Sequence, residues 1–167
     1  VLISLAVGLL ALILFVWRQT RLEQPMLRMG VFKYPMFTLS LLFMIIAMMI
    51  ILAAAILLPL YLKGSLLVSS AIAGLILLPG GFLNAALSPV IGQLFDRVGP
   101  RPFIPIGFLL AAIGLFSLSH ITENTAIALI ILCHSIVFIG ITFMFMPSQT
   151  YGLNQLPPKL YPDGSAV

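Results

Sequence analysis

One short stretch of the sequence gathers the residue types that could form a charge-based switch. A single carboxylate, Asp96, stands beside two guanidinium groups, Arg97 and Arg101. Cations stabilise the negative C-terminal end of a helix, whereas a carboxylate is stabilised at the positive N-terminal end of another helix. Gly92 would let a neighbouring helix approach, and Gly99 can adopt the positive φ that a tight reversal needs. We predict a conformational latch formed by Asp96, Arg97 and Arg101, with Gly92 and Gly99 as its geometric requirements.

Three further polar side chains fall in or beside apolar stretches. An ionisable side chain inside a membrane span is a functional candidate by default, so His134 could line a substrate cavity or change protonation there. The alternative is a neutral His134 that is hydrogen-bonded to a neighbouring helix. Asn84 could equally line a cavity or bridge two helices. Tyr61 is expected to belong to an interfacial aromatic belt, with an outer gate as the alternative.

Catalytic and metal chemistry find little support in the sequence. His120 and His134 have no Glu at ligand spacing, and Cys133 is the only cysteine. No glycine-rich phosphate loop followed by Lys is present. We therefore predict no metal, no cofactor and no enzyme activity.

The amino-acid composition indicates whether the protein is surrounded by water or by lipid. Of 167 residues, 62% are hydrophobic and 7% are charged, against roughly 25% charged in an ordinary soluble domain. A water-soluble globule is thereby excluded, and the surface must face lipid. Long uninterrupted apolar runs favour helices over a transmembrane barrel, whose strands would alternate over about 10 residues. The predicted fold class is an all-α membrane protein.

Five apolar segments are long enough to be transmembrane helices. A helix rises about 1.5 Å per residue, and the hydrocarbon core is about 30 Å thick. The first segment lacks an initiator Met and ends in Trp17 and Arg18, so we interpret it as the truncated end of a span in a fragment of a longer protein. The predicted spans are 1–17, 36–62, 69–95, 103–119 and 125–147, and the remaining ranges, 18–35, 63–68, 96–102, 120–124 and 148–167, are loops.

Glycine and proline distinguish some of these spans. The segment 69–95 is interrupted by several of them and is expected to lie inside a bundle, where neighbouring helices can satisfy the freed backbone groups. Pro59 and Pro79 are candidate flex points. The face formed by Gly107, Ala111 and Gly114 is expected to allow a close helix approach.

The distribution of positive charges predicts how the chain is oriented in the membrane. Seven of the eight Lys and Arg residues lie in 18–35, 96–102 and 148–167. Because cytoplasmic loops carry an excess of Lys and Arg, these three ranges are predicted to be cytoplasmic, and 63–68 and 120–124 extracellular. This placement explains the net charge of +4 without a nucleic-acid partner.

The stretch with the candidate latch, Gly92-Gln93-Leu94-Phe95-Asp96-Arg97-Val98-Gly99-Pro100-Arg101, resembles the Gly-x-Leu-x-Asp-Arg-x-Gly-x-Arg loop of the major facilitator superfamily. That loop follows the second helix of each six-helix half. The alternative is a basic turn that only obeys the positive-inside rule, but this rule requires neither the carboxylate nor the glycines.

Other stretches are similar to the second half of fourteen-helix drug:proton antiporters of the EmrB/QacA type, including the lincomycin-resistance group. The resemblance implies that 1–17 is helix eight of fourteen and that the other four spans are helices nine to twelve. The matching stretches are Pro59-Leu60-Tyr61-Leu62, Gly74-Leu75-Ile76-Leu77-Leu78-Pro79-Gly80, Pro147-Ser148-Gln149-Thr150 and Asp163-Gly164-Ser165-Ala166.

The resemblance implies a multi-pass transporter of the bacterial cytoplasmic membrane that exports small lipophilic or cationic drugs by alternating access, driven by protons. Its partners would be the lipid bilayer and the remaining helices of the same full-length chain. Two alternatives stay open. One is a major facilitator permease for a metabolite or sugar, and the other is an integral membrane enzyme or sensor.

Overall fold

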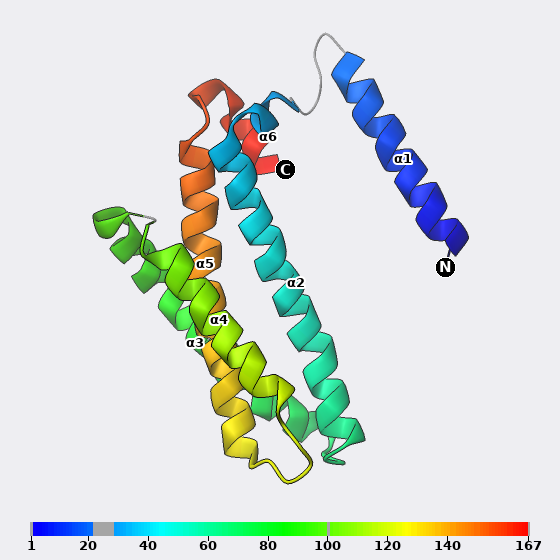
Figure 1. Cartoon of the computed structure of the whole chain (residues 1–167), viewed down its shortest axis with the longest axis vertical. Helices are drawn as coiled ribbons and strands as arrows, with labels where there is room; N and C mark the ends of the chain where they lie inside the picture. The colour runs from blue at the N-terminus through cyan, green and yellow to red at the C-terminus, as the bar shows by residue number, and fades with distance from the viewer. Residues whose placement is uncertain (1, 22–28, 100, 167) are drawn as a thin grey trace. The chain divides into compact units, whose positions relative to one another are not determined.

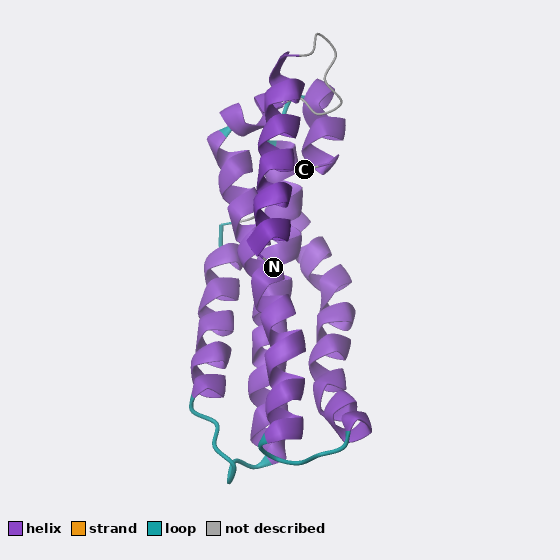
Figure 2. Cartoon of the chain, turned by 90° about the vertical axis from the view of Figure 1, so that its right-hand side faces the viewer, coloured by secondary structure: helices purple, strands orange, loops and turns teal. Residues whose placement is uncertain are grey.

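The computed structural model describes residues 2–21, 29–99 and 101–166. Within these residues every regular element is helical and no strand occurs (Figures 1 and 2). The α-helices are α1 (Leu2–Arg21), α2 (Pro35–Gly64), α3 (Ser70–Val98), α4 (Phe103–Ser119), α5 (Ile127–Asn154) and α6 (Tyr161–Ala166), and the short 3-10 helices are η1 (Met29–Lys33) and η2 (Pro158–Leu160).

Three of these helices are long and apolar enough to cross a membrane. They are α2, α3 and α5, with 30, 29 and 28 residues. The 17 residues of α4 make a shorter apolar helix, and α1 is likewise apolar. In hydrocarbon a helix satisfies its backbone polar groups internally, which explains why these runs are helical throughout. The chain has an all-α membrane fold, as predicted.

Several boundaries differ from the predicted loops. Helix α1 extends to Arg21 and α2 to Gly64, and η1 lies in the range 18–35. Asp96 and Arg97, which we placed in a loop, lie in the last turn of α3. The range 148–167, expected as a loop, begins with the last turns of α5 and continues through η2 and α6. Pro147 lies inside α5, and the helix continues past it to Asn154.

The chain divides into two compact units, Ser40–Tyr151 and the pair of segments Val1–Leu39 and Gly152–Val167. In the larger unit, the connections α2–α3 and α4–α5 lie at the same end (Figure 1). In the smaller unit, Val31, Phe37 and Leu156 form a buried cluster. Gly164 fits against it so closely that a Cβ there would lie 3.3 Å from the Phe37 ring.

Helix α5 is the most buried helix of the larger unit. Half of its most apolar stretch is buried, against 17% for α2 and for α3. The expectation that 69–95 lies inside the bundle of the full-length protein stays a prediction, because the described residues cover only part of that bundle. A Cβ built on Gly74, Gly81 or Gly92 of α3 would meet no described atom within 4 Å.

The contact between α4 and α5 is a direct approach of two backbones. A Cβ built on Gly107 would lie 2.7 Å from the carbonyl oxygen of Gly140, and one on Gly140 would lie 2.5 Å from the backbone nitrogen of Ala111. A Cβ on Gly114 would lie 2.9 Å from the backbone nitrogen of Val137. The predicted close-approach face of α4 is confirmed, and Gly140 is its counterpart on α5.

We predict that Gly140→Ala destabilises the full-length protein by about 2 kcal/mol, because overpacking a tight contact typically costs about 1–3 kcal/mol. The obstructing atoms are backbone and cannot rotate away. Reversible unfolding of the purified protein measures this change. Gly64→Ala is the matched control, because a Cβ at Gly64 meets nothing within 4 Å. Equal stability of the two variants would contradict the close approach.

Candidate functional site

The end of α3 carries three of the predicted latch residues. Asp96 and Arg97 are exposed in its last turn, and Gly99 follows as the C-cap. Gly99 has φ of +83°, and its N–H donates to the Phe95 carbonyl over 2.8 Å. This φ is strained for residues with a Cβ, so the glycine has the positive φ that the sequence predicted, while its role in a latch stays a prediction. Arg101 is exposed between Gly99 and α4.

Asp96 borders a cavity of about 300 Å³ between α3 and α5. Its walls are Gly92, Phe95 and Asp96 from α3, and Met146, Pro147 and Thr150 from α5. The aromatic cluster of Phe95 and Phe103 lies beside it, with ring centroids 6.4 Å apart. This packing holds the α3–α4 turn against α5.

The structure places the latch residues close in the chain but does not join them. Among the described residues, Asp96 makes no ion pair with Arg97 or Arg101. A carboxylate in the last turn of its own helix faces the negative end of that helix dipole, which is unfavourable. Arg97 at the same end is favourable. The end of α3 therefore does not stabilise the charge of Asp96, and a positive partner elsewhere could.

Asn84 bridges two helices. Its side-chain nitrogen donates to the Thr142 hydroxyl over 2.7 Å and to the Phe138 carbonyl over 3.4 Å, which links α3 to α5. Thr142 is buried and donates in turn to the Phe138 carbonyl over 2.8 Å. Of the two alternatives for Asn84, the described contacts are those of an interhelical hydrogen bond.

His134 lies one helical turn from this bond and is buried, with 3% of its side chain exposed. Its ring rests on Phe138, with centroids 4.6 Å apart, and fills the place that a Cβ would occupy at Gly80. Nδ1 has no hydrogen-bond partner among the described residues. The expected hydrogen bond to a neighbouring helix is thus not seen at this nitrogen, and packing positions the ring instead.

The two candidate flex points lie inside helices. Pro59 is in α2 and Pro79 is in α3. A proline in a helix interior leaves one carbonyl without its usual N–H partner. Both helices nevertheless continue past the proline. No group of three or more His, Cys, Asp or Glu side chains that could hold a metal ion occurs among the described residues.

One polar group escaped the sequence reasoning. The hydroxyl of Tyr61 is buried and has no hydrogen-bond partner among the described residues, although the sequence favoured an aromatic-belt position for it. A belt residue would expose its hydroxyl to the interface. The only signal in the sequence is its place near the end of an apolar run, which does not tell which way the side chain points.

Comparisons with known proteins agree with the resemblance of the motifs. Residues 1–167 match the family described as the Major Facilitator Superfamily. The chain is 54% identical over its whole length to the lincomycin resistance protein LmrB of Listeria innocua, of which it covers 36%. It is 47% identical to the LmrB protein of Bacillus subtilis, of which it covers 35%. No solved structure matches. The chain thus spans about a third of the length of these curated relatives.

We predict that Asn84→Ala and Thr142→Ala are coupled in stability. Interhelical hydrogen bonds in membrane proteins contribute about 0.6 kcal/mol on average and at most about 1.7 kcal/mol. A double-mutant cycle by reversible unfolding of the full-length protein should return a coupling energy in this range. The control pairs Asn84→Ala with Ser117→Ala, whose hydroxyl donates only within α4. Strict additivity of the first pair would show that the bond is absent.

Proposed function

The chain belongs to the major facilitator superfamily, and we propose that the full-length protein exports small lipophilic or cationic drugs in exchange for protons. It would do so by alternating access in the bacterial cytoplasmic membrane. The long apolar helices support a multi-pass membrane protein. No metal or cofactor takes part in this proposal.

The single observation that carries the proposal is the similarity to the lincomycin resistance proteins. It extends over all 167 residues at 54% identity, so no inserted or foreign domain separates this chain from the corresponding third of that protein. The apolar character of the helices fits lipophilic cargo, because a hydrophobic lining favours apolar ligands. The rest of the transporter lies outside this chain.

The latch residues have a defined task in this proposal. Asp96 lies at the negative end of its own helix and makes no ion pair among the described residues. The N-terminus of a helix in the rest of the transporter would supply that partner. Since such a contact can exist in only one of the two access states, it would hold that state. Arg97 and Arg101 would stabilise the C-terminal end of α3 in both states.

Asn84 and His134 have a structural task in this proposal. Asn84 is half-buried on α3, and His134 is buried on α5. Their contacts fix α3 against α5, so their first task is to keep the two helices together. A substrate would meet their remaining polar atoms only if the cavity of the full transporter reaches this depth. Pro59 and Pro79 would let the outer parts of α2 and α3 bend.

We predict that everted membrane vesicles containing the full-length protein accumulate ethidium, a lipophilic cation, when a proton gradient is imposed. A protonophore should abolish the accumulation, because proton return is the driving force. Fluorescence quenching of the dye follows the uptake. Uptake that persists with the protonophore but needs ATP would contradict proton coupling. Absence of uptake for ethidium and for lincomycin alike would contradict drug export.

We predict that Asp96→Asn lowers the transport rate about two- to fivefold at unchanged expression, the factor that corresponds to about 0.3–1 kcal/mol. The substitution removes the charge but keeps the size, so the attraction to a helix N-terminus is lost while packing is preserved. The rate of ethidium efflux, normalised to the amount of protein in the membrane, measures the effect.

Glu123→Gln is the matched control for this variant. Glu123 is the exposed carboxylate of the connection between α4 and α5, far along the chain from the latch. It should transport at the normal rate. Unchanged transport by Asp96→Asn would remove the latch role from Asp96, whereas equal losses in both variants would indicate a general effect of charge.

A further inference from the structure

The middle of α3 carries a polar side chain whose two ends have different surroundings. Asn84 lies at the midpoint of this 29-residue helix, which is the depth at which many transporter folds place their substrate sites. Its side-chain nitrogen donates to the Thr142 hydroxyl over 2.7 Å and to the Phe138 carbonyl over 3.4 Å, both on α5. The donor end of the amide is therefore committed to the link between the two helices.

The orientation of the Asn84 amide follows from these partners. The Thr142 hydroxyl already donates to the Phe138 carbonyl over 2.8 Å, so its hydrogen is used. A reversed amide would bring the Asn84 oxygen against the Phe138 carbonyl oxygen, and two acceptors with no hydrogen between them repel each other. Nδ2 therefore faces α5, and Oδ1 is the end that remains free.

Oδ1 of Asn84 is accessible and has no hydrogen-bond partner among the described residues. It does not belong to the buried side-chain atoms that lack a partner in this part of the chain, so an approaching molecule can reach it. The neighbouring Gly81 and Ala85 are exposed and small, which leaves room beside the amide for the body of a ligand. An acceptor without a donor at this depth of a membrane is unfavourable.

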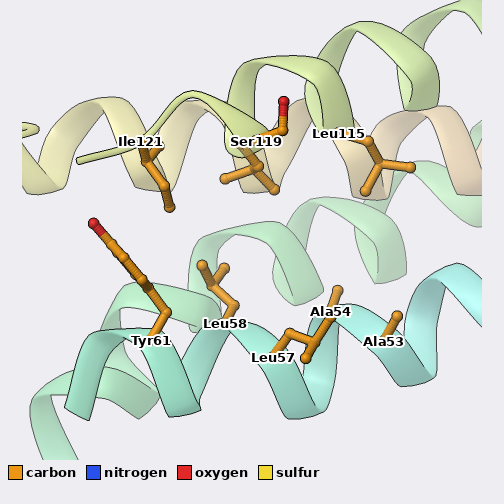
Figure 3. A pocket seen from close by; sticks show the side chains of 9 residues that line it. Ala53, Ala54, Leu57, Leu58, Tyr61, Leu115, Ser119 and Ile121 are labelled. Carbon is orange, nitrogen blue, oxygen red and sulfur yellow. The ribbon is translucent and has the colours of Figure 1, made fainter. Parts of the chain in front are cut away.

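Among the described residues, the cavity between α2 and α4 offers no comparable acceptor. It has a volume of about 370 Å³, and the side chains of the two helices face each other across it (Figure 3). Its walls contain two hydroxyl groups: that of Ser119 donates to the Phe116 carbonyl over 2.7 Å, and that of Tyr61 is buried. The other wall residues are apolar. This cavity can therefore pack against hydrocarbon, whereas Asn84 can recognise a polar group.

We propose that Oδ1 of Asn84 accepts a hydrogen bond from an N–H or O–H group of the exported drug and so favours lipophilic cations that carry such a donor. The inference rests on the proposed export of lipophilic cations and names the subclass that binds most tightly. A neighbouring backbone is no alternative donor, because the N–H groups of a spanning helix are bonded within that helix. A cation with an N–H group brings the donor with it, and its charge strengthens the bond.

The test compares two dyes that differ mainly in this donor. Rhodamine 6G and tetramethylrhodamine ethyl ester are flat lipophilic cations with the same xanthene core and the same ethyl ester. The amino groups of rhodamine 6G carry N–H bonds, whereas those of the second dye are fully alkylated. Fluorescence anisotropy gives their dissociation constants for the purified full-length protein in detergent. We expect Asn84→Leu to weaken binding of rhodamine 6G about fivefold, the effect of losing one hydrogen bond, and to leave binding of the other dye unchanged.

Thr142→Val is the matched control for this variant. Both substitutions remove the hydrogen bond between α3 and α5, but only Asn84→Leu removes the acceptor. Thr142→Val should therefore keep the ratio of the two dissociation constants that the unmodified protein shows, although it lowers stability. Asn84→Ala repeats the measurement with a side chain too small to obstruct folding, and the same loss of discrimination is expected.

Three results would overturn the inference. An unchanged ratio in Asn84→Leu and Asn84→Ala would show that Oδ1 does not meet the ligand. An equal loss of binding for both dyes would reduce Asn84 to its link with α5. A ratio that changes as much in Thr142→Val would assign the effect to the helix contact.

A separate measurement distinguishes failure of this inference from failure of the proposed export. Uptake of both dyes by everted vesicles with the unmodified protein would leave drug export intact under any of the three results. Absence of binding and of uptake for both dyes would overturn the export of lipophilic cations together with the inference.

Discussion

The close approach of α4 and α5 is the constraint on which the larger unit depends. Gly107 and Gly140 let the two backbones come near enough that even one methyl group would collide with a peptide atom. Association of helices in lipid rests on packing, because lipid chains solvate apolar side chains as well as protein does. Small residues on both helices make that packing possible. With α4 packed in this way, the other buried surface of α5 contacts α2 and α3.

The attachment of α3 to α5 uses a different device. The first contact is steric: the His134 ring occupies the space left by the missing side chain of Gly80. The second, one helical turn further along α3, is the hydrogen bond between Asn84 and Thr142. Neither contact is large. Together they join a helix that is mostly uncovered in the described residues to the most buried helix of the unit. The latch turn with Asp96 is carried on the far end of the same α3, so its position depends on this attachment.

The helices and the close-approach face of α4 could be predicted from the sequence because each depends on residues of one continuous segment. Apolar runs and the spacing of Gly107, Ala111 and Gly114 are local patterns. Gly140 was missed, because one glycine in an apolar helix becomes meaningful only when its partner is known. The alternatives for Asn84 depended on the rotation of α3 relative to α5, which no local pattern encodes. The interior placement of 69–95 stays a prediction, because small residues permit packing without telling which helix is the partner. The latch role of Asp96 stays a prediction.

The fit of His134 into the notch at Gly80 limits how α3 and α5 can move. A slide of one helical turn, about 5.4 Å, would bring Ile76 or Asn84 opposite the imidazole in place of the glycine. Either side chain would need the space that the ring already fills. A slide of α3 along α5 by one turn therefore requires the imidazole to move. Without that movement, the parts of the two helices that meet at Gly80 and His134 keep their register.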